Sequence, residues 1–188
     1  MTVLEAGDRF GGAVASARLL DGVDVRLSRF SYLVSLLPQQ IIDDLGLELE
    51  LRSRRIASYT PVADGGLLIE RQPGEVTRAS FAAGPGPGAY AAFTGLEHRL
   101  HRFAAAVAPT LTAPLPRASS IRTAVGEELW DDLVERPIGE LIERTTADDH
   151  LRGLLLNDAL IGTFADAHAA GLEQNRCFLY HVIGNGTG

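Results

Sequence analysis

The residues best placed to do chemistry lie near the N-terminus, where an acidic residue and two glycines follow a short apolar run. Glu5 comes directly after Thr2-Val3-Leu4, and Gly11-Gly12 follow a few residues later. A carboxylate at the end of a strand can accept hydrogen bonds from both hydroxyls of a ribose, as it does in dinucleotide-binding folds. Paired glycines let the backbone approach a pyrophosphate where a Cβ atom would collide. By itself this spacing fits an ordinary strand and turn equally well.

The composition of the chain removes several other chemistries. All 17 basic residues are arginines, so a Schiff-base lysine and a P-loop lysine are excluded among these 188 residues. Cys177 is the single cysteine, which excludes an internal disulfide and a cysteine-based zinc site. The net charge of −7, with no Lys/Arg-rich run, argues against nucleic acid as a partner.

The N-terminus and the hydropathy pattern bear on location. The first residues lack the basic and apolar regions of a signal peptide. No apolar run reaches the ~18 residues that a membrane-spanning helix needs. We therefore expect a cytoplasmic protein with no integral membrane segment.

Histidine-containing motifs elsewhere are weak candidates for catalysis or metal binding. Glu97 to His101 has the wrong order and spacing for a zinc-binding His-Glu-x-x-His helix, so His98 and His101 are interpreted as solvated helix residues. His181 lies in an apolar context that favours a packed histidine over a catalytic base. We expect no metal site, and no residue can be assigned as a catalytic acid or base.

The elements that would position these residues divide the chain into two parts. Residues 1–71 have an α/β pattern and residues 72–188 a mostly helical one, and Gly84 to Gly88 form the strongest break. In the first part we expect strands at 2–4, 23–27 and 47–59, a helix from Pro38 to Gly46, and a hairpin turn at Asp64-Gly65-Gly66. In the second part we expect helices at 89–107, 125–135, 138–144 and 148–161, while 178–183 fits a strand or a helix equally well.

The N-terminal motif resembles a known cofactor fingerprint. Val3 to Gly12 is similar to the second half of the FAD fingerprint of the amine-oxidase and phytoene-desaturase superfamily, apolar-Leu-Glu-Ala-Arg-Asp-Arg-apolar-Gly-Gly. Gly7 and Ala13 stand where the amine-oxidase form has arginines. The change at Ala13 is usual in the phytoene-dehydrogenase-like branch.

Further segments resemble that branch, which contains pyridine nucleotide-disulfide oxidoreductase domain protein 2. Ser28 to Ile41 is similar to the stretch that follows the Gly-Gly pair there, and three short segments are similar as well: Thr60-Pro61, Asn157 to Gly162, and Tyr180 to Gly184. The resemblance therefore covers nearly the whole chain, most specifically residues 2–61 and 155–184.

The resemblance implies an FAD cofactor and an oxidoreductase activity. It implies that residues 1–71 are part of a Rossmann-like FAD/NAD(P)-binding domain and that 72–188 form a mostly helical substrate domain. The activity would be oxidation or desaturation of a small organic or apolar substrate by hydride transfer to FAD. The residues that would lie at the ribose, the pyrophosphate or the flavin are Glu5, Arg9, Gly11, Gly12, Ala13, Arg29, Ser31 and Tyr32.

Two glycine-rich segments of this family have no counterpart in the sequence. Such proteins begin with a strand and Gly-x-Gly-x-x-Gly, which holds the pyrophosphate at a helix N-terminus, and they end with a second glycine-rich FAD segment. We therefore expect an internal fragment that binds FAD weakly or not at all and is inactive alone. Two alternatives stay open: a remnant that serves as a binding or interaction module, and a subunit completed by a partner chain. Exposed strand edges would also favour a homo-oligomer.

Overall fold

The computed structural model describes residues 2, 4–31 and 33–187, with the backbone alone for 185–187. The chain divides into two compact units, an N-terminal unit of residues 1–34 and a C-terminal unit of residues 35–188. The sequence predicts a different division, into part of a cofactor-binding domain (residues 1–71) and a substrate domain (residues 72–188). That division concerns function, and it stays a prediction.

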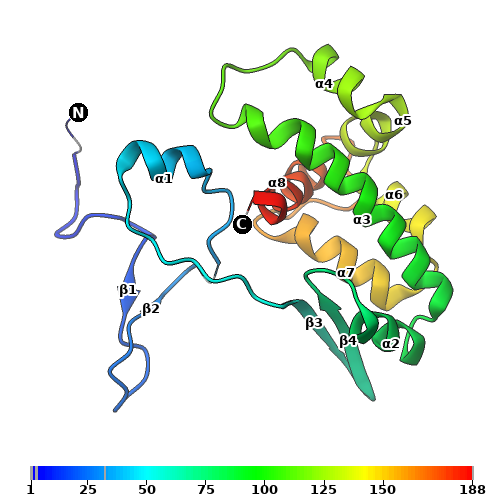
Figure 1. Cartoon of the computed structure of the whole chain (residues 1–188), viewed down its shortest axis with the longest axis horizontal. Coiled ribbons are helices and arrows are strands. Elements are labelled where there is room, and N and C mark those ends of the chain that lie inside the picture. Colours follow the sequence, from blue (N-terminus) through cyan, green and yellow to red (C-terminus); the bar gives the residue numbers. More distant parts are fainter. Residues whose placement is uncertain (1, 3, 32, 188) are drawn as a thin grey trace. The chain divides into compact units, whose positions relative to one another are not determined.

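The N-terminal unit is built around a small antiparallel ribbon (Figure 1). Strand β1 (Ser16–Ala17) pairs with β2 (Leu27–Ser28), with Ser16 opposite Ser28. None of the described residues in this unit is buried. Two short strands cannot enclose a core, so this unit has little hydrophobic stabilisation of its own.

The structure differs here from two of the predicted strands. Thr2 and Leu4 belong to no strand, and Val3 lies outside the described residues. In the predicted strand 23–27 only Leu27 is paired. Strands need a partner for their backbone groups, and both sheets in the described part of the chain are two-stranded and antiparallel. The mixed α/β content is confirmed, whereas the described residues form no parallel Rossmann-like sheet.

The C-terminal unit begins with a short helix and a hairpin. Helix α1 (Gln39–Leu45) ends at Gly46, whose left-handed backbone (φ 59°) caps it as the sequence predicts. Strands β3 (Ile56–Val62) and β4 (Gly65–Glu70) form the predicted hairpin. The strand predicted to begin at residue 47 begins later, because β4 ends opposite Ile56 and earlier residues have no partner strand.

The remaining elements are helical. They include the helices predicted at 89–107, 125–135, 138–144 and 148–161, and helices at 75–83 and 118–125 that were not predicted. They are α2 (Glu75–Ala83), α3 (Pro87–Val107), the 3-10 turn η1 (Ala108–Thr110), α4 (Ala118–Val125), α5 (Glu127–Trp130), the π-helical η2 (Asp131–Glu135), α6 (Ile138–Thr145), α7 (Asp149–Leu160) and α8 (Glu173–Thr187). The segment 178–183, which fitted a strand or a helix, lies in α8.

Helix α3 is the centre of the core (green in Figure 1). Its buried side chains recur every three or four residues at Phe93, Leu96, Leu100 and Phe103, as expected for an amphipathic helix. It packs against α2, α4 and α8. No helix of the described residues is long and apolar enough to cross a lipid bilayer.

Candidate functional site

The loop predicted to bind a dinucleotide is exposed and turns twice at glycine. Gly11 and Gly12 both have left-handed backbone, with φ of 106° and 53°. A Cβ atom at Gly11 would lie 2.8 Å from the carbonyl oxygen of Val14, so the turn requires glycine there. A Cβ atom at Gly12 would meet nothing within 4 Å, so this backbone is open to an approaching group.

The carboxylate of Glu5 faces its own loop. Its Oε1 accepts a hydrogen bond of 2.7 Å from the Gly7 N–H, and the residue is exposed. A glutamate in this position can still accept hydrogen bonds from a ligand, because a carboxylate has about four acceptor positions. It does not stand at the end of a strand, which is where the sequence pattern placed it.

The ribbon brings the second predicted segment next to the residues that follow the loop. The Arg29 N–H donates to the Ala15 carbonyl over 2.9 Å, which extends the pairing of β1 and β2. The guanidinium of Arg29 lies 5.5 Å from the ring centroid of Phe30. Arg29 therefore stands beside the strand that follows Ala13 in sequence.

The other predicted cofactor residues are exposed in the same unit. Arg9 and Ala13 are exposed, and the Ser31 N–H donates to the Ser28 hydroxyl over 3.0 Å. Tyr32 lies outside the described residues.

An adenosine diphosphate group fits these residues in part. The open backbone at Gly12 suits close approach of a pyrophosphate, and Arg9 and Arg29 carry the opposite charge. Glu5 offers the acceptor that a ribose needs. The helix N-terminus that usually grips the pyrophosphate is not supplied by the described residues of this unit.

A second group of charged residues joins three helical segments in the C-terminal unit. The Asp132 side chain, 7% exposed, forms ion pairs with Arg99 from α3 and Arg144 from α6. Burial alone would raise the pKa of Asp132, but the hydrogen bonds from the two arginines outweigh it and hold this pKa below its ordinary range. Sequence spacing gave no signal for this cluster, because its members come from separate helices.

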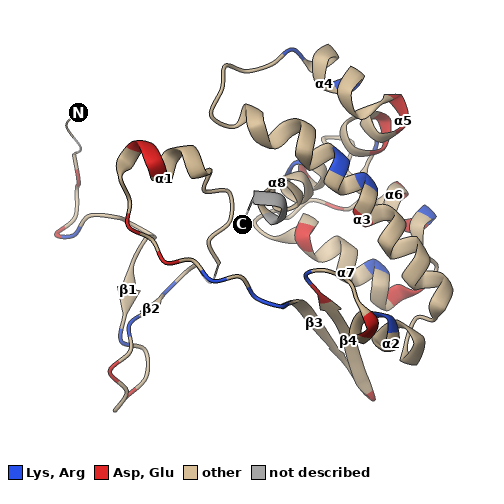
Figure 2. Ribbon diagram, in the orientation of Figure 1, with Lys and Arg blue, Asp and Glu red and all other residues tan. Residues whose placement is uncertain are grey.

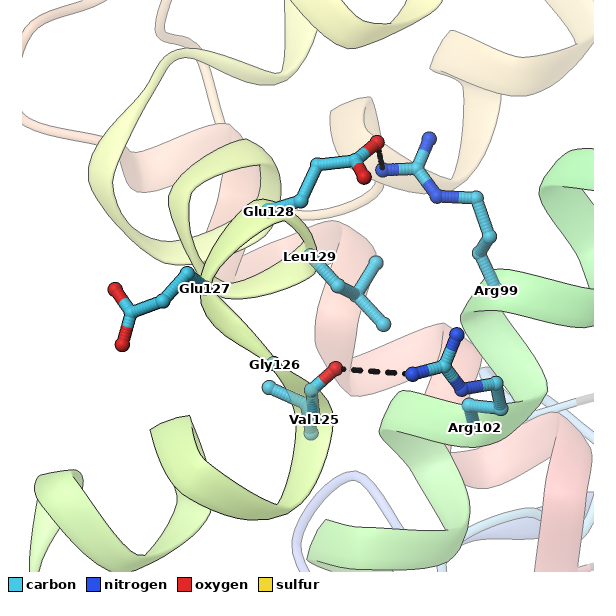
Figure 3. A pocket seen from close by; sticks show the side chains of 7 residues that line it. All are labelled: Arg99, Arg102, Val125, Gly126, Glu127, Glu128 and Leu129. Atoms are coloured by element: carbon cyan, nitrogen blue, oxygen red, sulfur yellow. Dashed lines mark hydrogen bonds and ion pairs between the residues drawn. The ribbon is translucent and has the colours of Figure 1, made fainter.

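A pocket of about 200 Å³ lies beside this cluster (Figure 3). Arg99 reaches Glu128 over 3.3 Å, and Arg102 donates to the Val125 carbonyl over 3.2 Å. Both guanidinium groups are therefore engaged by the protein itself. This arrangement stabilises the contact of α3 with α4 and α5, and it presents no group poised for chemistry.

The acidic and histidine residues of α3 form no metal site. Burial raises the pKa of Glu97, and the nearby Asp158 adds to this while His101 and His98 oppose it. Both histidines are exposed on the helix, as predicted. Within the described residues no group of three or more His, Cys, Asp or Glu side chains could hold a metal ion.

His181 contacts two neighbouring residues of its own helix, α8. Its Nδ1 lies 2.9 Å from the Cys177 carbonyl oxygen, and its ring meets that of Tyr180 edge-on at 5.3 Å. Both contacts are made within α8 and the residue is half-buried, so the interpretation as a packed histidine stays a prediction.

Comparisons with known proteins point to oxidoreductases. Uncharacterised proteins of Mycobacterium bovis and Mycobacterium tuberculosis are 43% identical over 99% of this chain, which covers 37% of their length. Pyridine nucleotide-disulfide oxidoreductase domain-containing protein 2 of mouse and rat is 26% identical over 97% of this chain and 36% of its own length.

The chain thus spans little more than a third of the curated relatives it matches. The distant relation to an oxidoreductase domain protein is confirmed, in agreement with the resemblance of the motifs. No protein-family model matches the chain, and no solved structure matches it.

Proposed function

We propose that this chain is part of a phytoene-dehydrogenase-like, FAD-dependent oxidoreductase of the cytoplasm that oxidises or desaturates a small organic or apolar substrate. The observation that carries the proposal is the similarity to pyridine nucleotide-disulfide oxidoreductase domain-containing protein 2 over 97% of this chain. It is supported by the left-handed glycines Gly11 and Gly12 at the position of the family's Gly-Gly pair.

The residues of the loop and of the second segment have different roles in this proposal. Glu5 accepts hydrogen bonds from the ribose, and the open backbone of Gly12 lies along the pyrophosphate with Arg9 nearby. Arg29 and Ser31, on the second segment, lie near the flavin. When bound, FAD supplies the hydride acceptor, and the protein supplies orientation and electrostatics. Residues 72–188 act as the substrate domain and residues 1–71 as part of the cofactor domain.

The cofactor assignment can be tested by titrating the ¹⁵N-labelled chain with FAD and following its amide resonances. NMR detects weak binding, which is what we expect of this chain alone. Resonances of residues 5–13 should shift progressively, and Gly12→Val and Glu5→Gln should reduce the shifts. Gly22→Val and Asp21→Asn are matched controls, because Gly22 also has a positive φ (76°) and open space at its Cβ position. Shifts confined to residues outside 5–13, or equal losses in the controls, would contradict the assignment.

The proposed oxidoreductase activity is tested in the longer relatives of this chain. The 43%-identical protein of Mycobacterium tuberculosis should purify with a stoichiometric flavin absorbance that bleaches on reduction. A colourless protein that takes up no added FAD would overturn the proposed class.

Exposed apolar side chains favour a second candidate, a module completed by another polypeptide. In the N-terminal unit the exposed fractions are 91% for Leu4, 82% for Phe10 and 84% for Val14. Apolar surface of this kind is commonly covered by a partner or a second copy. Light scattering should show self-association of the purified chain, and a monodisperse monomer at all concentrations would count against completion by a second copy.

A further inference from the structure

Arginines gather in a pocket at the open end of the β3–β4 hairpin. The pocket has a volume of about 440 Å³, and its lining residues are Ser53, Arg54, Arg55, Glu70, Arg71 and Gln72. Figure 2 shows the basic stretch that leads into β3 and the basic position after β4. This pocket shares no residue with the loop proposed to bind FAD.

The backbone fixes the position of these arginines. Arg55 directly precedes β3 and Arg71 directly follows β4, and the Arg71 N–H donates to the Arg55 carbonyl over 2.8 Å. This bond continues the pairing of the hairpin by one step beyond Ile56 and Glu70. Two cationic residues are therefore held across from each other at the end of the hairpin.

The one carboxylate in the pocket is already committed to another element. Oε2 of Glu70 accepts hydrogen bonds from the Gly74 N–H at 3.3 Å and from the Thr77 N–H and hydroxyl at 3.2 Å. Oε1 lies 3.9 Å from Arg55, at the limit of an ion pair, and the Arg55 side chain is 78% exposed. Glu70 therefore neutralises the pocket only in part.

Arg54 adds a further positive charge. Among the residues that the structure describes, it forms no hydrogen bond or ion pair, and it is exposed. In a chain with a net charge of −7, three guanidinium groups around one pocket are a local excess of positive charge. Such a site attracts anions selectively.

We propose that this pocket binds the diphosphate group of a small molecule. A carboxylate offers two oxygens and one charge, which a single guanidinium fork satisfies. Three guanidinium groups, with the Ser53 hydroxyl and the Gln72 amide as further donors, match a group with more oxygens and more charge. The volume leaves room beside the diphosphate for an attached organic group.

Isothermal titration calorimetry at low ionic strength tests this proposal with pyrophosphate, ADP and adenosine as probes. Pyrophosphate and ADP should bind saturably and adenosine should not, because the diphosphate is the recognised group. Arg54→Gln/Arg71→Gln should weaken pyrophosphate binding by roughly tenfold or more, since each variant residue removes a charge-assisted contact. Both positions are exposed, so the double variant should still fold, and circular dichroism checks this. The single variant Arg54→Gln is a second test of the weakened pyrophosphate binding.

The control Arg117→Gln/Arg176→Gln makes the same change in net charge at exposed positions outside the pocket. It should leave the affinity within about twofold. Absence of saturable pyrophosphate binding, or equal weakening in both double variants, would overturn the proposal. Adenosine that binds as tightly as ADP would overturn it as well. Glu5→Gln should not alter pyrophosphate affinity, so this site and the proposed FAD loop can fail separately.

Discussion

The guanidinium of Arg99 lies 2.5 Å from Oδ2 of Asp132, and this ion pair joins α3 to η2. Arg144 on α6 binds the other oxygen of the same carboxylate. One buried aspartate thus connects α3 to η2 and α6, two segments that follow one another later in the chain. Helix α3 is therefore held to its neighbours by this ion pair as well as by its apolar side chains.

Replacing Asp132 with asparagine should lower the free energy of unfolding by about 2 kcal/mol at pH 7. The variant loses the charge in both bonds, but the arginines are 30% and 50% exposed and can return to water, so the loss stays below that of a fully buried pair. The wild-type contribution is present above the ordinary aspartate pKa of 3.8 and is lost as the pH falls through the lowered pKa of the folded state. Urea unfolding at several pH values measures both effects.

Asp131→Asn is the matched control for this variant. Asp131 lies 2.8 Å from Arg136, but both side chains are more than 40% exposed. The variant should cost no more than about 1 kcal/mol. A similar loss in the two variants would show that burial of Asp132 is unimportant.

Glu97→Gln should stabilise the protein at neutral pH. Burial raises the pKa of Glu97 in the folded state, so the stability it contributes is full below the ordinary value of 4.5 and is lost as the pH rises through the raised value. Glutamine removes this loss, so the two proteins should differ at pH 7 and converge in acid. Thermal unfolding between pH 4 and 8 measures the difference, and Glu48→Gln, at an exposed position, should leave the profile unchanged.

Asn175→Ala should destabilise the chain by about 3 kcal/mol. The Asn175 side chain, on α8, donates to the Leu133 and Arg136 carbonyls and accepts from the Ile138 N–H, and the residue is only 2% exposed. Truncation leaves these backbone groups without partners in the interior. Chemical denaturation gives the free energy of unfolding. Asn157→Ala, on the exposed face of α7, should be neutral or stabilising.

Two glycine-to-alanine changes in helices should have opposite signs. A Cβ at Gly139 in α6 would lie 2.8 Å from the His168 ring and 3.0 Å from the Ala167 carbonyl oxygen, so alanine should destabilise the protein by about 1 kcal/mol or more. A Cβ at Gly95 in α3 would meet nothing within 4 Å, so alanine there should stabilise it by about 0.5–1 kcal/mol. Differential scanning calorimetry compares the two, and stabilisation at both positions would contradict the close packing at Gly139.

Local patterns in the sequence predicted most of the helices. The apolar spacing along 89–107 predicted α3, and the glycine after residue 45 predicted the end of α1. These predictions succeed because helix contacts and caps are local in sequence. The strands at the N-terminus were less predictable, since a strand forms only where another chain segment supplies its hydrogen-bond partners.

For the candidate sites, too, some features could be predicted from the sequence and others could not. The types and spacing of Glu5, Gly11 and Gly12 are compatible with a dinucleotide loop, and the resemblance of Val3 to Gly12 and of Ser28 to Ile41 indicates a family. Both could be recognised in the sequence because such motifs are short continuous segments. The pairing of Arg99 with Asp132, and the meeting of Arg55 with Arg71 at the end of the hairpin, could be read only from the tertiary structure. Such contacts join residues distant in sequence, and their strength depends on burial and on the surrounding charges, which only folding establishes.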